Sequence, residues 1–330
     1  MPDLLLSSSD FADKPLIATD DVPNCPVCGG GAFTDFAKGY DYESQTCRNE
    51  WRFVSCDQCT HVWLNPRPAI STLPVIYPPT YYAYNYAQQI SPIARRGKQW
   101  LDAGKMKSII RRLPGEPKSY IDIGCGDGRF LRAMHERGLQ KQNVYGLELD
   151  EKVIAPLQAD GYRAYCRRVE DCVEVPSGSI DLATMFHVIE HVDDPGTVVR
   201  RVADWLAPGG VFAVETPNID SLDARTFKES FWGGYHIPRH WNLFSPPTLK
   251  RLFEDAGLRV IHTSFQTGHS FWMYSLQHSL NFGRRPRKGL ARFFNPLTGL
   301  PMLIGFTAWD KLRAKVGART SAMLMLAQRA

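Results

Sequence analysis

An apolar run near the middle of the chain ends in three closely spaced glycines and reads Ile121-Asp122-Ile123-Gly124-Cys125-Gly126-Asp127-Gly128. We expect a buried strand to end and a helix to begin here. Glycines at alternate positions let the backbone turn sharply, and they let a ligand approach without interference from Cβ atoms. The spacing is G-x-G-x-G, whereas dinucleotide sites carry G-x-G-x-x-G. The difference favours a ligand that lacks a pyrophosphate and lays a charged amino-acid tail along the loop.

From Ser119 onward, strand-like and helix-like segments alternate, which is typical of a parallel sheet with helices on both faces. We therefore predict an α/β fold, doubly wound, with a mainly parallel seven-stranded sheet. The predicted strands are Tyr120–Ile123, Val144–Leu149, Arg163–Cys166, Ile180–Phe186, Val211–Glu215, Leu258–Thr263 and Ala322–Ala327. The predicted helices include Phe130–Arg137, Pro195–Leu206 and Thr248–Asp255. The interval 264–321 is too long for a simple connection, so we predict an insertion before the final strand.

A carboxylate follows the glycine loop at the end of the next predicted strand. Glu148 lies twenty residues beyond Gly128. An acidic side chain at this position can accept hydrogen bonds from both hydroxyls of a ribose. A glycine loop alone is weak evidence, but loop, acid and strand context together indicate a nucleoside-bearing cofactor.

These motifs resemble those of class I methyltransferases that use S-adenosylmethionine (SAM). Asp122 to Gly128 with Glu148 resembles motif I and its acidic partner, and residues 180–182, 190–192 and 206–210 resemble later motifs of that family in the same order. The resemblance covers about residues 115–265. It implies a Rossmann-like methyltransferase fold with SAM as the cofactor. The cofactor-binding residues that it implies are Asp122, Gly124, Gly126, Gly128, Glu148, Val169, Glu170 and His187.

Five of the eight cysteines lie between Cys25 and Cys59, in two C-x-x-C pairs separated by 27 residues and one further cysteine. Four thiolates at this spacing, Cys25, Cys28, Cys56 and Cys59, predict a tetrahedral zinc site. Such a site has no open coordination position, so the zinc is expected to be structural. Cys47 and His61 are alternative ligands, but a spare cysteine and a surface histidine are the favoured interpretation.

The order of these features suggests a linear domain organisation. Residues 1–21 are expected to be a flexible tail, 22–68 a small zinc-binding β module, and 69–114 a connector rich in tyrosine and proline followed by a helix. Residues 115–330 form the expected methyltransferase domain, with the insertion at 264–321.

Two segments carry candidate catalytic residues. Methyl transfer from a sulfonium is an in-line displacement, so an enzyme must align the nucleophile and often remove its proton. The candidate general bases are His240, His236 and His191, in that order, with Glu190 beside His191. Histidine titrates near neutrality, which suits it to this role. The alternative is that Glu190 and His191 only position the adjacent helix.

The segment 231–240 combines aromatic, glycine, histidine and arginine residues, which suits a polyhydroxylated or anionic ligand. The candidate substrate-binding residues are Trp232, Tyr235, Arg239 and, from the connector, Tyr82. Arg239 can bind a phosphate or carboxylate with both nitrogens of its fork. The alternative is a rigid loop whose histidines are already hydrogen-bonded.

Two groups of methyltransferases share parts of this pattern. Glu190-His191 resembles the E-H motif of the O-methyltransferases of ubiquinone biosynthesis. The zinc knuckles, the tyrosine-rich connector and Tyr235-His236 followed by His240 resemble sugar methyltransferases that act on nucleotide-linked deoxysugars. Their segment reads Y-H-E-H, whereas Pro238 and Arg239 intervene here. The resemblance implies transfer to a hydroxyl or activated carbon of a sugar or secondary metabolite.

Composition narrows the remaining possibilities. The net charge of +5 is mild, which permits an anionic substrate and does not favour nucleic acid as a partner. No apolar run is long enough to span a bilayer and no signal peptide is evident, so a cytoplasmic monomer or homodimer is expected. RNA methylation is an alternative, although the D/N/S-P-P-aromatic motif of many base-amine enzymes is absent and residues 185–188 read M-F-H-V. A non-catalytic SAM-binding scaffold is a third possibility.

The insertion contains a basic cluster, residues 284–288, followed by an apolar stretch at 297–309. Such a pair can contact anionic lipid or a lipid-linked substrate. A stretch that covers the core of its own domain, or that forms a dimer face, is the favoured interpretation.

Overall fold

The computed structural model describes residues 11–78 and 92–330, which form two compact units. The first unit contains the described residues up to Arg96, together with Pro217–Thr248 and Phe265–Met323. The second unit contains Gly97–Thr216, Leu249–Ser264 and Leu324–Ala330. Within the described ranges, no helix is long and apolar enough to cross a membrane.

A seven-stranded sheet forms the framework of the fold, and it confirms the predicted fold class. The pairs β10–β9, β9–β6, β6–β7 and β7–β8 are parallel. Their residues are buried almost without interruption, as expected for strands that are covered on both faces. In spatial order the strands are β12 (Leu258–Gln266), β13 (Ala322–Arg329), β10 (Leu206–Pro217), β9 (Ile180–Phe186), β6 (Tyr120–Ile123), β7 (Val144–Glu148) and β8 (Arg163–Cys166).

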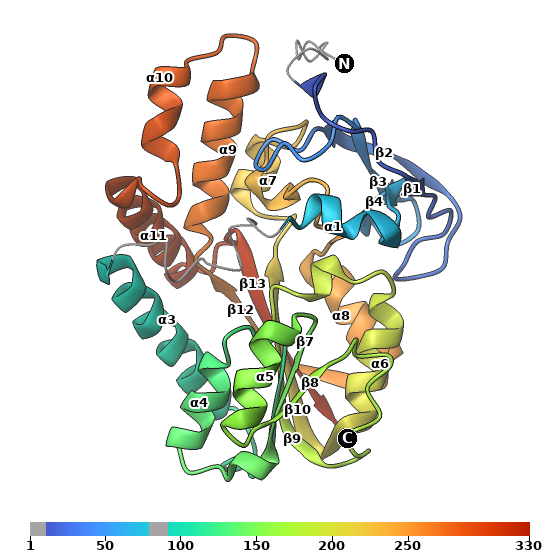
Figure 1. Cartoon of the computed structure of the whole chain (residues 1–330), viewed down its shortest axis with the longest axis vertical. Helices are drawn as coiled ribbons and strands as arrows, with labels where there is room; N and C mark the ends of the chain where they lie inside the picture. The colour runs from blue at the N-terminus through green and yellow to red at the C-terminus, as the bar shows by residue number, and fades with distance from the viewer. Residues whose placement is uncertain (1–10, 79–91) are drawn as a thin grey trace. The chain divides into compact units, whose positions relative to one another are not determined.

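Helices pack on both faces of this sheet (Figure 1). Helix α6 starts where Asp194 caps it, since its Oδ1 accepts a hydrogen bond from the Thr197 N–H at 2.8 Å, and Pro195 follows at the first helical position. The core on one face includes Leu131, Ile154 and Leu182. The helices are α3 (Pro92–Ile110), α4 (Arg129–Glu136), α5 (Glu151–Ala159), α6 (Pro195–Trp205) and α8 (Pro246–Asp255), with 3-10 turns η4 (Lys141–Asn143) and η5 (Ile189–His191).

A second, antiparallel sheet lies in the first unit. Its order is β11 (Asn242–Leu243), β4 (Val62–Leu64), β3 (Trp51–Cys56) and β2 (Phe33–Gly39). Because β11 pairs with β4, residues near 242 belong to the same unit as the cysteine-bearing residues. The two compact units therefore do not follow the predicted linear boundaries at 68 and 114. Short elements of this unit are β1 (Thr19–Asp20), β5 (Arg67–Pro68), η2 (Ile70–Thr72), α1 (Leu73–Ile76), α7 (Leu222–Thr226) and η6 (Gly233–Tyr235).

The predicted flexible tail is wrong for residues 11–21. Phe11 is buried and stacks on Tyr40 with ring centroids 5.2 Å apart. Ile17 is also buried, and its N–H and C=O are both bonded to the side chain of Asn49 at 3.0 Å. Strand β1 then pairs with β5. Two buried apolar side chains and a paired backbone fix this segment, although its composition is polar.

The predicted insertion between the last two strands is helical. It contains α9 (His269–Phe282), α10 (Lys288–Ala291), η7 (Arg292–Phe294) and α11 (Leu300–Lys315). Figure 1 shows α9, α10 and α11 in orange to dark red, as neighbours within the first unit.

Candidate functional site

The glycine loop connects β6 to α4 and takes the sharp turn that its sequence predicts. The N–H groups of Gly124 and Cys125 both donate to the Leu147 carbonyl, at 2.8 and 3.0 Å. Gly124, Gly126 and Gly128 all have positive φ, at 73°, 51° and 79°. This region of φ is costly for residues with a Cβ atom, so the turn requires glycine at these positions.

The three glycines differ in what lies in front of them. A Cβ atom at Gly124 would approach the Val188 side chain to 2.3 Å, and one at Gly128 would approach Leu157 to 2.4 Å. A Cβ atom at Gly126 would meet nothing within 4 Å. Gly124 and Gly128 therefore pack the loop against its own unit, while Gly126 faces open space. This open backbone is the part of the loop that a ligand can approach.

Glu148 closes the loop from the neighbouring strand. Its carboxylate accepts hydrogen bonds from the Gly126 N–H at 3.2 Å and from the Leu149 N–H at 2.7 Å. A carboxylate has about four acceptor positions, so these two bonds leave capacity for the hydroxyls of a ribose. The structure thus brings Glu148 and the open face of Gly126 together, as the sequence predicts.

Asp122 lies beneath the loop and is almost fully buried. Its Oδ1 accepts a hydrogen bond from the Thr184 hydroxyl at 2.6 Å, and the Tyr120 hydroxyl lies 2.6 Å from the same Thr184 oxygen. Burial raises the pKa of Asp122 to about 7, and the nearby charge of Glu148 adds to this increase, against the lowering effects of Thr184 and Arg129. Asp122 supports the loop through this chain of hydrogen bonds, and its predicted contact with the cofactor stays a prediction.

Val169 and Glu170 follow β8, the strand next to β7. Val169 is buried, and Glu170 accepts a hydrogen bond from the Arg168 guanidinium at 2.9 Å. Both lie after the carboxyl end of a parallel strand, where ligands bind in doubly wound sheets. Their predicted position near an adenine is untested.

His187 lies at the carboxyl end of β9 between two carboxylates. Its Nδ1 is 3.2 Å from Glu190 Oε1 and its Nε2 is 3.5 Å from Glu215 Oε1. The residue adopts the left-handed region with φ 56°. Burial lowers the pKa of His187, but Glu190 and Glu215 outweigh this effect and raise it to about 9. The imidazole is therefore positively charged at neutral pH.

Glu190 positions His187 and does not begin helix α6, which Asp194 caps. Glu190 is fully buried and also accepts a hydrogen bond from the Thr216 hydroxyl at 3.0 Å. His191 ends the short turn η5 and is half-buried. Glu190 therefore does not cap the adjacent helix, because its carboxylate is directed to His187 and Thr216, and its predicted catalytic role stays a prediction.

The cysteine pairs form two similar knuckles in the first unit. The Sγ atoms of Cys25 and Cys59 are 3.6 Å apart, and those of Cys28 and Cys56 are 3.5 Å apart. All four sulfur atoms lie within 4.8 Å of one another. A residue with positive φ follows each pair, Gly29 at 75° and Thr60 at 63°. The predicted ligand set is therefore assembled.

His61 is not the surface histidine that the sequence suggested. It is fully buried, its Nε2 lies 3.2 Å from Asn242 Oδ1, and burial lowers its pKa to about 4. Neither His61 nor Cys47 belongs to the four-sulfur cluster. The partner Asn242 lies 181 residues further along the chain, on β11.

Arg239 is committed to an ion pair within the first unit. Its Nη1 and Nη2 donate to the two oxygens of Asp41 at 3.0 and 3.2 Å, and its Nε donates to the Ile76 carbonyl at 2.9 Å. Both side chains are completely buried. The predicted contact of Arg239 with a phosphate or carboxylate is therefore wrong for this structure, because Asp41 already occupies the guanidinium fork.

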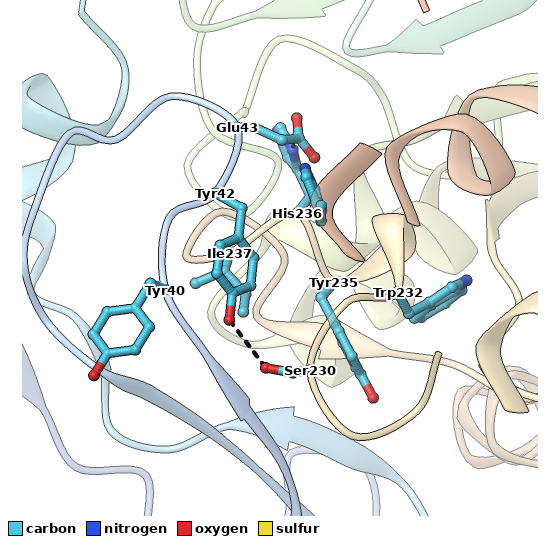
Figure 2. Close-up of a pocket in the computed structure, with 9 residues that line it drawn as sticks. Tyr40, Tyr42, Glu43, Ser230, Trp232, Tyr235, His236 and Ile237 are labelled. Carbon is cyan, nitrogen blue, oxygen red and sulfur yellow. Dashed lines mark hydrogen bonds and ion pairs between the residues drawn. The ribbon is translucent and has the colours of Figure 1, made fainter. Parts of the chain in front are cut away.

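Trp232, Tyr235 and His236 line a small pocket (Figure 2), in which the hydroxyls of Tyr42 and Ser230 are hydrogen-bonded at 3.0 Å. Trp232 donates its ring N–H to Asp223 at 2.7 Å, and Tyr235 donates its hydroxyl to the Lys228 carbonyl. The free space is about 10 Å³, enough for roughly one water molecule. The contacts of Trp232 and Tyr235 with substrate remain predictions, and Tyr82 lies outside the described residues.

The same pocket contains two buried polar groups that the sequence did not single out. Glu43 Oε2 lies 2.8 Å from His236 Nδ1, while Glu43 Oε1 has no hydrogen-bond partner among the described residues. His278 Nε2 also has none there. Both residues line the pocket, so a hydrogen-bonding group inside it could bind to Glu43 Oε1 and His278 Nε2.

His240 has a defined tautomer. Its Nδ1 lies 2.8 Å from the Gly234 carbonyl oxygen, which can only accept a hydrogen bond. In the neutral ring Nδ1 therefore carries the proton and Nε2 carries the lone pair. This is the arrangement that a general base needs.

Comparison with known proteins identifies the family. The model of a methyltransferase-domain family matches residues 98–263, half of the chain. A ubiquinone biosynthesis O-methyltransferase from Neisseria meningitidis serogroup C is 30% identical over 210 residues, which cover 55% of this chain and 85% of that protein. The chain belongs to the methyltransferase family. Its cofactor is therefore SAM, and the order of motifs in the second unit is explained.

Two further relatives of this methyltransferase illustrate how far the similarity extends. A ubiquinone biosynthesis O-methyltransferase from Idiomarina loihiensis is 32% identical over 157 residues, covering 44% of this chain and 63% of that protein. A SAM-dependent methyltransferase from Archaeoglobus fulgidus has a solved structure that is 18% identical, with a TM-score of 0.48, covering 75% of this chain and 100% of that chain.

Sequence reasoning missed two charged residues of the methyltransferase beside His187. Lys105, on α3, is ion-paired with Glu215, and its Nζ lies 4.6 Å from the centre of the Phe186 ring. Burial raises the pKa of Glu215, but Lys105 and His187 together hold it far below its usual range. Glu215 ends a predicted strand next to β9, so the sequence could have placed it beside His187. Nothing in the sequence of α3 predicts that Lys105 lies next to Glu215.

Proposed function

We propose that this methyltransferase transfers the methyl group of SAM to a hydroxyl oxygen of a small-molecule acceptor, with His240 as the general base. The observation that carries the proposal is the tautomer of His240: the hydrogen bond from Nδ1 to the Gly234 carbonyl places the lone pair of the neutral ring on Nε2. The names of the relatives support oxygen over carbon as the methyl acceptor. The acceptor class that we propose is a hydroxylated sugar or secondary metabolite.

The chain supplies binding, orientation and proton removal. SAM supplies a methyl group on a positively charged sulfur. Glu148 would hold the ribose hydroxyls, and the open backbone at Gly126 would accommodate the amino-acid tail. When bound, SAM would give up its methyl group to the acceptor oxygen and leave as a neutral thioether, and His240 Nε2 would take the proton of the acceptor hydroxyl.

The acidic and basic groups around His187 suit an orienting role. Glu190 and Glu215 hold the imidazole from both nitrogens, and Lys105 balances Glu215. A ring that is already protonated at neutral pH cannot act as a base there. We therefore place His187 with the groups that fix the cofactor end of the site. His236 and His191 remain the second and third candidates for the base.

The four cysteines support a structural zinc ion. For Zn–S bonds of about 2.3 Å, a regular tetrahedron has S···S edges of about 3.8 Å. Two of the sulfur distances, 3.5 and 3.6 Å, lie close to this value, and all are within 4.8 Å. Four thiolates leave no open coordination position, so the zinc would stabilise the first unit and take no part in methyl transfer.

Replacing Glu148 with alanine tests the cofactor half of the proposal. Wild-type protein is expected to bind SAM and S-adenosylhomocysteine with micromolar dissociation constants in calorimetry. Loss of two hydrogen bonds to a carboxylate is expected to weaken both affinities by about 100-fold. Glu116→Ala removes an exposed carboxylate elsewhere and is the matched control. No binding by the wild type would refute the site.

Replacing His240 with glutamine tests the base. With acceptors drawn from phenols, catechols and nucleotide-linked sugars, kcat is expected to fall about 100-fold or more, while SAM affinity is unchanged. His236→Gln and His191→Gln measured beside it rank the three candidates. Mass spectrometry and NMR of the product separate oxygen from carbon methylation. Methylation of RNA alone, or SAM binding with no turnover on any acceptor, would contradict the proposal.

A further inference from the structure

The insertion carries a concentrated positive charge that the family match does not cover. Residues 284–292 contain four arginines, one lysine and no acidic residue, so this short segment carries as much net charge as the whole chain, +5. It lies outside the matched residues 98–263. The five basic residues are all exposed, and among the described residues none of them forms an ion pair. They are Arg284, Arg285, Arg287, Lys288 and Arg292.

Three of these arginines border an open groove. The groove has a volume of about 510 Å³ and lies at the end of α9. Its lining residues are Ser279, Leu280, Gly283, Arg284, Arg285 and Arg287. A guanidinium group can bind two oxygens of one phosphate at once, so this groove suits a phosphate-bearing group.

Large apolar side chains are exposed within the basic segment 284–292 and directly after it. Leu290 and Phe293 are 43% and 64% exposed. Helix α11 begins six residues after the end of η7, and it presents Ile304, Trp309 and Leu312 to solvent, at 56%, 46% and 59% exposure. Isolated exposed residues are ordinary, but Trp309 and Leu312 are three residues apart on one face of α11, and Ile304 lies about two turns before Leu312 on the same exposed side.

The inner face of α11 carries both apolar and polar side chains, since Phe306 stacks on Trp272 with ring centroids 5.8 Å apart. Asp310 is fully buried and accepts hydrogen bonds from the Gly268 N–H at 2.8 Å and the Trp272 ring N–H at 3.3 Å. A helix that packs on its own domain and faces water normally exposes polar residues, whereas α11 exposes several large apolar ones. Part of the apolar stretch therefore packs on its own unit, in keeping with the favoured interpretation of the sequence, while Ile304 and Trp309 stay exposed.

We propose that residues 284–316 dock on an anionic phospholipid surface. The arginines and Lys288 would bind lipid phosphates, and the exposed face of α11 would lie at the boundary between headgroups and acyl chains. Tryptophan is favoured at this depth, which fits Trp309. A symmetric contact between two copies would place like charges together, so a lipid surface fits the charge better. The inference is independent of the acceptor proposed above.

Sedimentation with vesicles tests the proposal on the full chain. Neutral vesicles consist of phosphatidylcholine alone. Anionic vesicles contain phosphatidylcholine with about a third phosphatidylglycerol. Wild-type protein is expected to bind the anionic vesicles and not the neutral ones. Arg284→Glu with Arg287→Glu is expected to lower the partition coefficient roughly 30-fold or more. Lys107→Glu with Arg111→Glu makes the same charge change at exposed positions in the last turn of α3 and directly after it, and should leave binding unchanged.

A second variant separates the apolar contribution from the charge. Ile304→Ser with Leu312→Ser is expected to weaken binding at least about tenfold at unchanged net charge. Circular dichroism and SAM affinity confirm that each variant is folded. Failure of the wild type to bind anionic vesicles at low salt would overturn the proposal. Dimerisation that Leu312→Ser abolishes, without any lipid binding, would assign the face to a second copy and would also overturn it.

Discussion

A variant with Cys28→Ser and Cys56→Ser is expected to bind no zinc and to lose more stability than any other substitution considered. Two sulfur atoms would be removed from a set of four that lie within 4.8 Å of one another. Structural zinc sites contribute on the order of 10 kcal/mol to the folding of small modules. The apolar cluster beside the knuckles is small, with Cys25, Val54, Cys56 and Trp63 as its buried members. We therefore expect the free energy of unfolding of the first unit to fall by at least about 5 kcal/mol.

Metal analysis and thermal unfolding measure this effect. Purified wild-type protein should contain about one zinc per chain, and a strong chelator should lower its unfolding temperature. Cys166→Ser, at the end of β8, is the matched control and should retain the metal. A wild-type protein without zinc, whose unfolding temperature no chelator changes, would show that the four cysteines serve another purpose.

Replacing Arg239 with methionine is expected to destabilise the first unit by about 3–5 kcal/mol. The substitution leaves the Asp41 carboxylate buried without its counter-charge, and such single removals cost this much. The remaining bonds to Asp41 come from the N–H groups of Ser44 and Thr46 and from the Thr46 hydroxyl. Urea unfolding followed by tryptophan fluorescence gives the change in free energy.

The double variant Asp41→Asn with Arg239→Met is the control, because it removes both charges. It should be more stable than Arg239→Met alone. In the wild type, burial raises the pKa of Asp41, but Arg239 and the Thr46 bonds lower it below its ordinary value. The pair therefore stabilises the fold above the ordinary carboxyl range, and this contribution is lost as the pH falls through the lowered pKa. Equal stability of the single and double variants would contradict the assigned role of Arg239.

The sheet was predictable because its signals are local. The predicted strands Arg163–Cys166 and Ile180–Phe186 agree with β8 and β9 at both ends, since each is a short apolar run between polar turns. The glycine loop and Glu148 were found for a similar reason. Parallel strands bring their carboxyl ends to one edge, so residues just after neighbouring strands meet there.

The partners of Arg239 and His61 were not predictable, because they are distant in sequence. Asp41 lies 198 residues from Arg239, and nothing near either residue indicates the pairing. His61 and Asn242 meet through the pairing of β4 with β11, a strand of two residues. A strand of two residues has no recognisable alternation of apolar and polar residues. The sequence therefore predicted neither the burial of His61 nor the inclusion of residues near 242 in the first unit.

The antiparallel sheet of the first unit joins strands that are synthesised far apart in time. Strands β2, β3 and β4 leave the ribosome before β11 exists, which follows about 180 residues later. At roughly 5–20 residues per second, the edge of β4 waits on the order of 10–35 seconds for its neighbour. During this interval an early zinc ion would hold the two cysteine knuckles together and limit wrong pairings of the exposed edge. Metal supply during translation would then govern the yield of folded enzyme more than its final stability does.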